Sequence, residues 1–304
     1  MIEVKNLTKK FDDYTALDSV TCSIPEGCIY GMVGSNGAGK STFLRLISGV
    51  YRPDGGEIRI DGEPVYENTK IKNEIAYVPD ELFFLSNASI ERMADLYHAV
   101  YKDFSVERCR SLTEAFKLNY TQNTATFSKG MRRQAAIILA ISCRPKYLFL
   151  DETFDGLDPV MRSLVKSLIM KDVAERNATA ILTSHSLREL EDTCDQLSLL
   201  HKGGLVFESD IMNLKTSLYK VQIAFTRSYD KDLFEGVDIL HYEKTGSVAG
   251  LIVRGDREET VARLKALEPA ILDVLPLTLE EVFTYEMSAL GYEFDITQFE
   301  GEEA

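Results

Sequence analysis

The sequence contains no tryptophan and little cysteine. Its cysteines are scattered, odd in number and form no Cys-x-x-Cys pair: Cys22, Cys28, Cys109, Cys143 and Cys194. Disulfide frameworks and structural zinc sites need cysteines in pairs or at regular short spacings. We therefore expect reduced thiols in a cytosolic fold, and we exclude a disulfide-rich secreted protein.

Long apolar runs are absent as well. The most apolar run, residues 135–143, is far shorter than the roughly 20 residues that a membrane-spanning helix needs. No basic segment followed by an apolar one opens the sequence, so we do not expect a secretory signal peptide. The sequence predicts a cytoplasmic chain without a membrane span of its own.

Basic residues are outnumbered by acidic ones. The chain has 34 Lys and Arg against 48 Asp and Glu, a formal net charge of −14. Nucleic acid and anionic lipid both attract basic faces, so we expect neither as the main partner. What the chain does have is 45% hydrophobic and 27% charged residues over 304 positions. That balance is typical of globular proteins, and the length predicts about two domains.

The order of patterns along the chain predicts the fold class. Residues 2–60 are rich in strand-like segments, and residues 82–117 have helical spacing. Strand and helix patterns then alternate from KYLFL to the hairpin LSLLHKGGLVFES, which favours a largely parallel α/β sheet. After about Asn213, three strand patterns, a helix and a further strand predict a small α+β domain. Thr278 and Glu281 have the spacing of a capping box for a last helix.

The segment GSNGAGKST, residues 34–42, matches the phosphate-binding pattern G-x-x-x-x-G-K-[ST] in full. It follows an apolar strand pattern and precedes a helical one, which is the context in which this motif binds nucleotide phosphates. Its glycines let the backbone amides point at an anion, and the helix N-terminus adds positive potential. Lys40 is expected to reach the β- and γ-phosphates, and Ser41 to ligate Mg²⁺. The predicted nucleotide-binding residues are Gly34, Ser35, Asn36, Gly37, Ala38, Gly39, Lys40, Ser41 and Thr42.

Two acidic residues end the apolar strand pattern YLFLDE. Asp151 is suited to complete the Mg²⁺ shell beside the glycine-rich loop, and Glu152 to polarise an attacking water. By itself this pattern is an ordinary acidic helix start. In company with the phosphate loop it favours catalysis.

A second turn of phosphate-binding type lies in TATFSKGMRRQAAIILA, residues 124–140. Ser128, Lys129 and Gly130 precede a basic and apolar helix there. A chain that already has a complete phosphate loop has no evident need of another one. The remaining motifs suggest why it carries two.

Together these motifs resemble those of an ATP-binding cassette (ABC) ATPase, the detached ATPase subunit of a bacterial-type transporter. GSNGAGKST resembles Walker A, YVPDE from Tyr77 the Q-loop, and FSKGMRRQ from Phe127 the LSGGQ signature. YLFLDE resembles Walker B, FDGLD from Phe154 the D-loop, and TSH ending at His185 the switch histidine. All six occur in the family's order and at its spacing within residues 1–213, which makes the combination specific.

The resemblance implies an α/β P-loop NTPase of ABC type, with a mixed sheet core, an antiparallel β subdomain and a helical subdomain, plus a small α+β C-terminal domain. The expected ATPase domain covers residues 1–213, with the helical subdomain at about 82–140. Residues 214–290 form the accessory domain, and residues 291–304 an acidic tail. The cofactors implied are ATP and Mg²⁺.

The resemblance also implies partners. Two cassettes, identical or different, face head to tail, so Ser128 and Gly130 of one chain approach the γ-phosphate held by the other. Asp158 is then a link between two active sites. A separate integral-membrane permease docks on the helical subdomain, which puts the chain on the inner face of the cell membrane. No nucleic acid is expected.

Several site residues rest on the resemblance, and some depart from it. His185 is expected to contact the γ-phosphate and to act with Glu152 in catalysis. Phe11 takes the place of the aromatic residue, often Tyr, that stacks on adenine. Asp80 stands where the family usually has Gln and can still meet Mg²⁺ or its water. Lys129 replaces the first glycine of the signature, and the resulting SKGM form resembles exporter-type ATPases.

Three functions compete at this point. The first is an ATP hydrolase that drives a membrane transporter, an exporter in the leading hypothesis. The second is a soluble ABC ATPase that acts on ribosomes or nucleic acid without a permease. The third is a P-loop kinase that passes phosphate to a small acceptor. A single acidic cassette without a coiled-coil insertion favours the first over the second, and the signature and D-loop favour it over the third.

Overall fold

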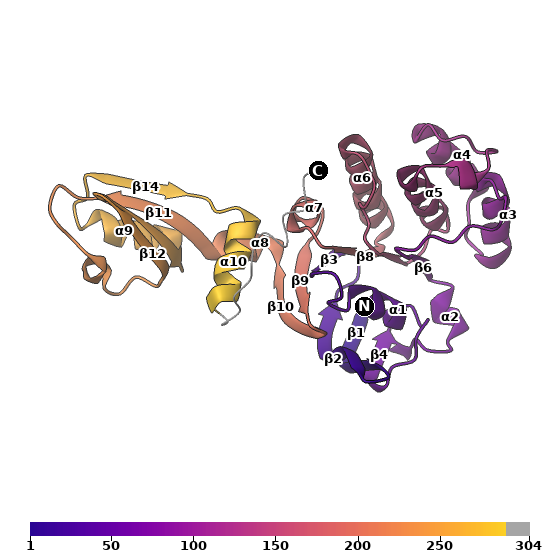
Figure 1. Ribbon diagram of the computed structural model, residues 1–304, viewed down its shortest axis with the longest axis horizontal. Helices are drawn as coiled ribbons and strands as arrows, with labels where there is room; N and C mark the ends of the chain where they lie inside the picture. Colours follow the sequence, from indigo (N-terminus) through magenta and orange to yellow (C-terminus); the bar gives the residue numbers. More distant parts are fainter. Residues whose placement is uncertain (290–304) are drawn as a thin grey trace. The chain divides into compact units, whose positions relative to one another are not determined.

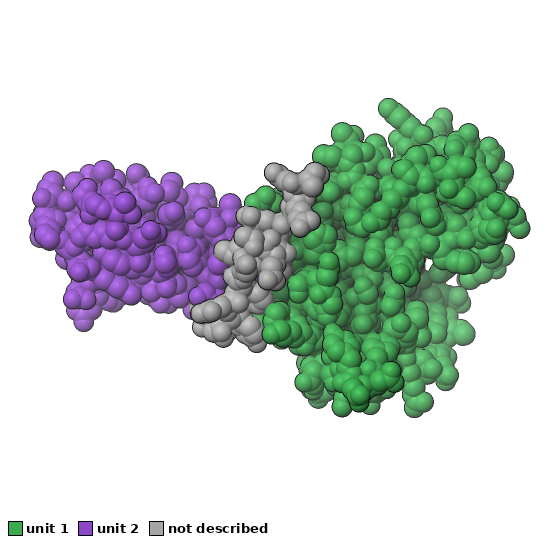
Figure 2. Space-filling view, viewed as in Figure 1, with its two compact units in different colours: residues 1–208 green, residues 209–304 purple. Residues whose placement is uncertain are grey.

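The computed structural model describes residues 1–289 and divides the chain into two compact units, residues 1–208 and 209–304 (Figure 2). The expected acidic tail at residues 291–304 lies outside the described residues. The unit boundary follows Glu208.

Unit 1 contains two sheets (Figure 1). The first has the strand order β2-β1-β4-β5 and is antiparallel throughout. Its strands are β1 (Ile2–Phe11), β2 (Tyr14–Ile24), β4 (Gly55–Ile60) and β5 (Glu63–Pro64). This sheet is the antiparallel β subdomain that the sequence predicted.

The second sheet has six strands in the order β10-β9-β3-β8-β7-β6. They are β3 (Ile29–Val33), β6 (Ile75–Val78), β7 (Tyr147–Leu150), β8 (Thr179–Ser184), β9 (Gln196–His201) and β10 (Gly204–Asp210). β3 pairs in parallel with β8 and β9, and β7 pairs in parallel with β6 and β8. Lys202 and Gly203, both at positive φ, turn the chain from β9 into the edge strand β10, as in a two-residue hairpin. The predicted mixed α/β sheet is confirmed.

Seven α-helices accompany these sheets in the part of unit 1 that is described. They are α1 (Lys40–Ile47), α2 (Thr69–Lys72), α3 (Ile90–Val100), α4 (Val106–Ala115), α5 (Lys129–Ser142), α6 (Pro159–Arg176) and α7 (Leu187–Glu191). α3, α4 and α5 pack against one another and form the predicted helical subdomain (Figure 1). One core of buried apolar side chains joins both sheets to α1, with Leu7, Leu17, Met32 and Phe43 among its members.

Unit 2 is a four-stranded antiparallel sheet with helices. In chain order its elements are α8 (Ile211–Ser217), β11 (Leu218–Ala224), β12 (Ile239–Thr245), β13 (Val248–Arg254), α9 (Arg257–Lys265), β14 (Ile271–Leu275) and α10 (Leu279–Ala289). A separate apolar cluster packs on the sheet, with Val221, Leu251 and Leu264 fully buried. The predicted capping box is present at the start of α10. The Thr278 amide donates to Glu281 Oε2 at 2.8 Å, and the Glu281 amide donates to Thr278 Oγ1 at 3.2 Å.

Within residues 1–289, no helix combines the length and apolar character needed to cross a bilayer.

Candidate functional site

The glycine-rich loop connects β3 to α1, as the motif requires. Gly37 and Gly39 have φ values of 81° and 110°, which side-chain-bearing residues rarely adopt. A Cβ atom on Gly39 would lie 2.7 Å from the carbonyl oxygen of Ala16. Only glycine therefore allows the backbone to pass so close to β2 while it wraps around a concave anion site.

Lys40 is buried at the bottom of this loop, with only 5% of its side chain exposed. Its Nζ donates to the carbonyl oxygens of Gly34 at 2.6 Å and Ser35 at 3.3 Å. The same atom lies 3.1 Å from Oε1 of Glu152. The loop thus holds a desolvated cation, and its carboxylate partner, Glu152, comes from the chain that follows β7.

A polar cleft of about 250 Å³ opens in front of the loop. It is lined by Tyr14, Ala16, Asn36, Gly37, Ala38, Gly39, Lys40, Ser41, Thr42, Asp80 and Glu152. The structure therefore brings together most of the loop residues singled out from the sequence with the two carboxylates Asp80 and Glu152.

Tyr14 lines this cleft although the sequence analysis did not single it out. Its hydroxyl donates to the carbonyl oxygen of Gly37 at 3.2 Å. Phe11, the predicted adenine-stacking residue, is not one of the lining residues and packs edge-on against Tyr51 with the ring centroids 5.5 Å apart. Tyr14 follows Phe11 by three residues, across the turn from β1 into β2.

Asp151 is fully buried at the end of β7. Its Oδ1 accepts a hydrogen bond of 2.8 Å from Thr183 Oγ1, and its Oδ2 accepts one of 3.4 Å from the Tyr77 hydroxyl. Thr183 Oγ1 also accepts from the Glu152 amide at 2.9 Å. Thr183, which stands two residues before His185, therefore positions both acidic residues. Thr183 belongs to the TSH motif, but nothing in the sequence indicates that it contacts the two carboxylate-bearing residues.

The donor set suits Mg²⁺. Ser41 at the start of α1, Asp80 and Asp151 all offer oxygen atoms, which this hard cation prefers. Among residues 1–289, no group of three His, Cys, Asp or Glu side chains converges as a ready-made metal site. Mg²⁺ is usually held by one or two carboxylates together with substrate phosphates, and Asp80 and Asp151 would supply those carboxylates.

Glu152 joins the phosphate loop to the predicted switch histidine. Its Oε2 lies 3.1 Å from Nδ1 of His185, while Oε1 faces Lys40. The backbone of Glu152 has a φ of 46°, a strained conformation for a non-glycine residue and one that recurs at functional sites. Glu152 therefore contacts both Lys40 and His185, two residues that come from different motifs.

The three groups shift one another's ionisation. Burial opposes the charged form of Glu152, but the hydrogen bond with His185 and the charge of Lys40 outweigh it, so the pKa of Glu152 is lowered. The hydrogen bond with Glu152 raises the pKa of His185 against the opposing effect of burial. Glu152 is thus an ionised carboxylate at neutral pH, and His185 holds its proton more firmly than a free histidine does.

The second phosphate-type turn lies at the start of α5. Ser128 is the N-cap of this helix and accepts from the Met131 amide at 3.2 Å. A Cβ atom on Gly130 would lie 2.4 Å from the carbonyl oxygen of Gly156, so this turn packs directly on the loop after β7. Neither Ser128 nor Gly130 lines the cleft of the first loop.

Two residues around this turn have local partners. Lys129 takes the place of the first glycine of the signature. Its Nζ atom forms an ion pair with Oδ2 of Asp155 at 2.6 Å. Asp158 caps α6 by accepting from the amides of Val160 and Met161, each at 3.0 Å. The ion pair and the Gly130 contact tie the turn to residues 155–156, within the segment that resembles the D-loop.

Comparison with known proteins agrees with these motifs. A protein-family model described as "ABC transporter" matches residues 17–155. The ABC transporter ATP-binding protein YtrB of Bacillus subtilis (strain 168) is 31% identical over 283 residues, which cover 93% of this chain and 97% of that protein. The chain belongs to the ABC transporter ATP-binding protein family. As an ABC protein it binds ATP.

A further relative and a solved structure are also similar to this chain. The bacitracin transport ATP-binding protein BcrA of Enterococcus faecalis is 31% identical over 219 residues, covering 70% of each chain. The solved "Structure of ATP binding subunit of ABC transporter" has a TM-score of 0.66 at 27% identity and covers 71% of this chain and 92% of that one. The match to YtrB is longer than unit 1, so this ABC protein shares part of its second unit with that relative.

Proposed function

We propose that this ABC protein is an ATPase subunit that hydrolyses ATP to drive a membrane exporter, as one of two cassettes in a dimer. The observation that carries the proposal is the contact of Glu152 with both Lys40 and His185 at the cleft of the glycine-rich loop. A cation for phosphates, a carboxylate for water and a histidine are three of the parts that phosphoryl transfer to water needs.

Each residue then has a role. Lys40 and the amides of residues 34–42 bind the ATP phosphates, and Ser41, Asp80 and Asp151 would hold Mg²⁺. When bound, Mg²⁺ supplies charge neutralisation at the β- and γ-phosphates. Glu152 accepts a proton from the attacking water, and His185 holds the carboxylate in place through Nδ1. Because phosphate competes with Glu152 for Lys40, ATP binding releases the carboxylate from the cation that lowers its pKa, which makes Glu152 a better base.

The second turn belongs to the neighbouring site in this proposal. Ser128 and Gly130 lie apart from the cleft of their own chain and approach the γ-phosphate that the second cassette holds. The adenine base contacts Phe11 or Tyr14, of which only Tyr14 lines the cleft. We assign residues 1–213 to the ATPase domain and residues 214–290 to the accessory domain.

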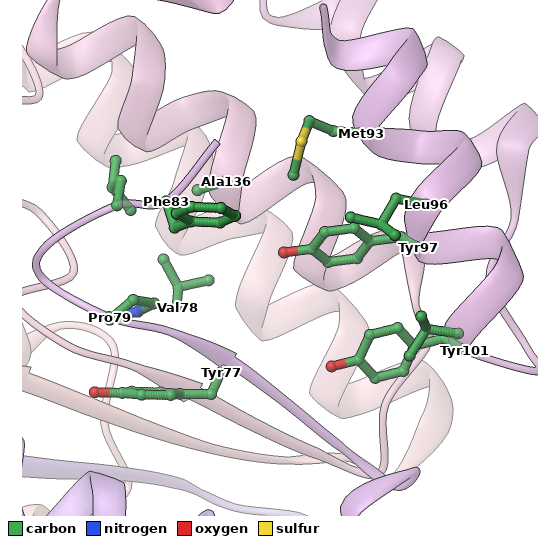
Figure 3. A pocket seen from close by; sticks show the side chains of 11 residues that line it. Tyr77, Val78, Pro79, Phe83, Met93, Leu96, Tyr97, Tyr101 and Ala136 are labelled. Atoms are coloured by element: carbon green, nitrogen blue, oxygen red, sulfur yellow. The ribbon is translucent and has the colours of Figure 1, made fainter. Parts of the chain in front are cut away.

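A second surface supports a membrane partner. An apolar groove of about 290 Å³ lies between the chain after β6 and the helix α3 (Figure 3). In Figure 3, Phe83 faces Met93, Leu96 and Tyr97 across this groove. Phe83, Leu96 and Val100 line the groove and are 73%, 40% and 60% exposed. A group of exposed apolar side chains at one place is typical of an interaction surface. We assign the groove to the cytoplasmic face of a separate permease subunit, which would hold the chain at the inner face of the membrane.

Export is the direction that the relatives favour. They include the BcrA proteins, named for bacitracin transport, and the daunorubicin/doxorubicin resistance ATP-binding protein DrrA of Streptomyces peucetius. A role in exporting a compound is consistent with both names.

Co-purification tests the proposal. The tagged chain, expressed in its natural host and extracted with mild detergent, should recover an integral-membrane subunit and release phosphate from ATP, and Glu152→Gln should stop the release. Recovery with ribosomes in place of a membrane protein would overturn the transporter assignment. Transfer of the γ-phosphate to an organic acceptor would overturn the hydrolase assignment.

A further inference from the structure

Arg133 is a charged side chain that the site described above does not use. It lies in the second turn of α5 and is only 1% exposed. Its guanidinium donates to the carbonyl oxygens of Pro79 at 3.0 Å, Asp151 at 3.1 Å and Asp80 at 3.2 Å, and to Oδ1 of Asp80 at 2.8 Å. One buried side chain thus joins α5 to the ends of β6 and β7.

Asp80 faces two ways. It forms the ion pair with Arg133, yet its side chain is 46% exposed and lines the cleft that also contains Lys40 and Glu152. A buried guanidinium without a carboxylate partner is strongly unfavourable, because its desolvation is then not compensated. The ion pair therefore fixes where the carboxylate of Asp80 stands at the edge of the cleft.

This pairing bears on the departure of Asp80 from the family pattern, in which Gln is usual. A glutamine amide offers Arg133 a neutral oxygen and leaves the buried positive charge uncompensated. The Asp at position 80 and the Arg at position 133 thus match each other in charge, although 53 residues separate them. A chain with Gln at position 80 would have no such need for a buried cation at 133.

We propose that Arg133 is a positioning residue for the nucleotide site: it orients Asp80 toward the magnesium-bound phosphates, and the two residues depend on each other. The inference rests on the proposed ATPase function. It adds that the family's usual residue, Gln, cannot replace Asp80 unless Arg133 changes as well. Arg133 itself touches neither ATP nor the metal. Its contact with the Asp151 carbonyl extends the same positioning to the end of β7, where Glu152 follows.

The test is a double-mutant cycle in the full-length protein, with Asp80→Gln, Arg133→Gln and the double variant. Two quantities are measured: the midpoint of thermal unfolding without nucleotide, and the binding of fluorescent ATP as Mg²⁺ is titrated, with a matched titration in EDTA. Arg133→Gln should raise the Mg²⁺ concentration for half-maximal binding by about 10- to 100-fold, as loss of an outer-shell partner does. Binding in EDTA should change much less.

The cycle separates positioning from a merely structural role. Asp80→Gln should lower the unfolding midpoint, and adding Arg133→Gln should restore part of it, because the buried charge and its missing partner are removed together. Arg133→Lys keeps the charge but not the planar fork, so its Mg²⁺ dependence should lie between those of the wild type and Arg133→Gln. If Arg133→Gln does not fold, the same two measurements on Arg133→Lys and on the double variant test the proposal.

Two results would overturn the proposal. One is an unchanged Mg²⁺ dependence in the folded Arg133 variants, which would leave Arg133 as a packing residue. The other concerns the double variant. If its unfolding midpoint falls below that of the wild type by the sum of the decreases in the two single variants, the two positions are independent. If the wild type does not bind ATP at all, the proposed function fails, and the thermal arm of the cycle still decides whether the pair is interdependent.

Discussion

The Nζ atom of Lys40 lies 3.1 Å from Oε1 of Glu152, and Oε2 of the same carboxylate lies 3.1 Å from Nδ1 of His185. Glu152 therefore connects the cation of the glycine-rich loop to the imidazole at the end of β8. A phosphate in the cleft would take Lys40 away from this contact.

Glu152→Gln should retain ATP binding and lower the rate of hydrolysis by about 10²–10⁴-fold, because the amide cannot accept a proton from water. Calorimetry of ATP binding and an assay of released phosphate measure the two effects separately. Glu81→Gln, the same change at an exposed residue of the loop after β6, is the matched control and should leave both unchanged. Near-normal hydrolysis by Glu152→Gln would rule out Glu152 as the base.

Lys40→Ala should weaken ATP binding by about 1.5–3 kcal/mol, the usual contribution of a hydrogen bond to a charged group. The loss should appear in the dissociation constant measured by calorimetry and not only in turnover. The exposed Lys70→Ala controls for a change in net charge. An unaltered ATP affinity in Lys40→Ala would contradict the assignment of this side chain to the phosphates.

The Glu152–His185 contact should make the stability of the nucleotide-free protein depend on pH. His185 has a raised pKa, so its contribution is complete below pH 6.5, its ordinary pKa, and declines as the pH rises through the folded-state value. Glu152 has a lowered pKa, so its contribution is present above 4.5 and is lost as the pH falls through the folded-state value.

His185→Gln should therefore destabilise the protein most between pH 4.5 and 6.5, and the difference from wild type should narrow toward pH 8.5. Thermal unfolding in buffers from pH 5 to 8.5 measures it. Glu152→Gln should remove the same pH dependence, since it removes the partner. A difference that widens as the pH rises would mean that the contact does not exist in solution.

Ser128→Asp should abolish ATP-dependent dimerisation without unfolding α5. Aspartate caps a helix as well as serine does, but its negative charge would oppose the γ-phosphate held by the second cassette. Ser128→Asn also caps well and adds no charge, so it is the matched control. Analytical ultracentrifugation of both variants with ATP, in the Glu152→Gln background to prevent turnover, makes the comparison. Equal dimerisation of the two variants would show that Ser128 does not face a phosphate.

Phe83→Asp should reduce recovery of the permease subunit by co-purification while the ATPase rate of the isolated chain stays the same. Phe83 is 73% exposed, so the change should cost little stability. Met212→Asp replaces another exposed apolar residue, 69% exposed and in unit 2, and should recover the permease normally. Full recovery with Phe83→Asp would mean that the groove is not the docking surface.

The parts of the fold and site that follow from local patterns could be predicted from the sequence. The loop between β3 and α1, the acidic residues after β7 and the capping box at α10 all depend on residues close together in the chain. The small helix α2, four residues long, was not predicted, because so short a helix shows no periodicity. Asn68 caps its N-terminus, and the side chain of Asn68 accepts hydrogen bonds from the amides of Lys70 and Ile71.

The parts that depend on distant residues could not be predicted. Nothing near Arg133 indicates that its partner is Asp80, and nothing near Asp151 points to Thr183. Lys129 illustrates the same limit, since its ion pair with Asp155 bridges 26 positions. The sequence supplied these residue types, but only the packing of α5 and β8 on the ends of β6 and β7 brings the side chains into contact.

The close approach of Gly130 to Gly156 has a mechanical consequence. Two stretches of main chain touch there with no side chain between them, so nothing compressible separates the start of α5 from the loop that follows β7. Movement of one stretch toward the other would therefore have to displace it as well, because the two main chains are already in contact. A side chain at position 130 would have to force the two stretches apart, because its Cβ atom would lie 2.4 Å from the carbonyl oxygen of Gly156.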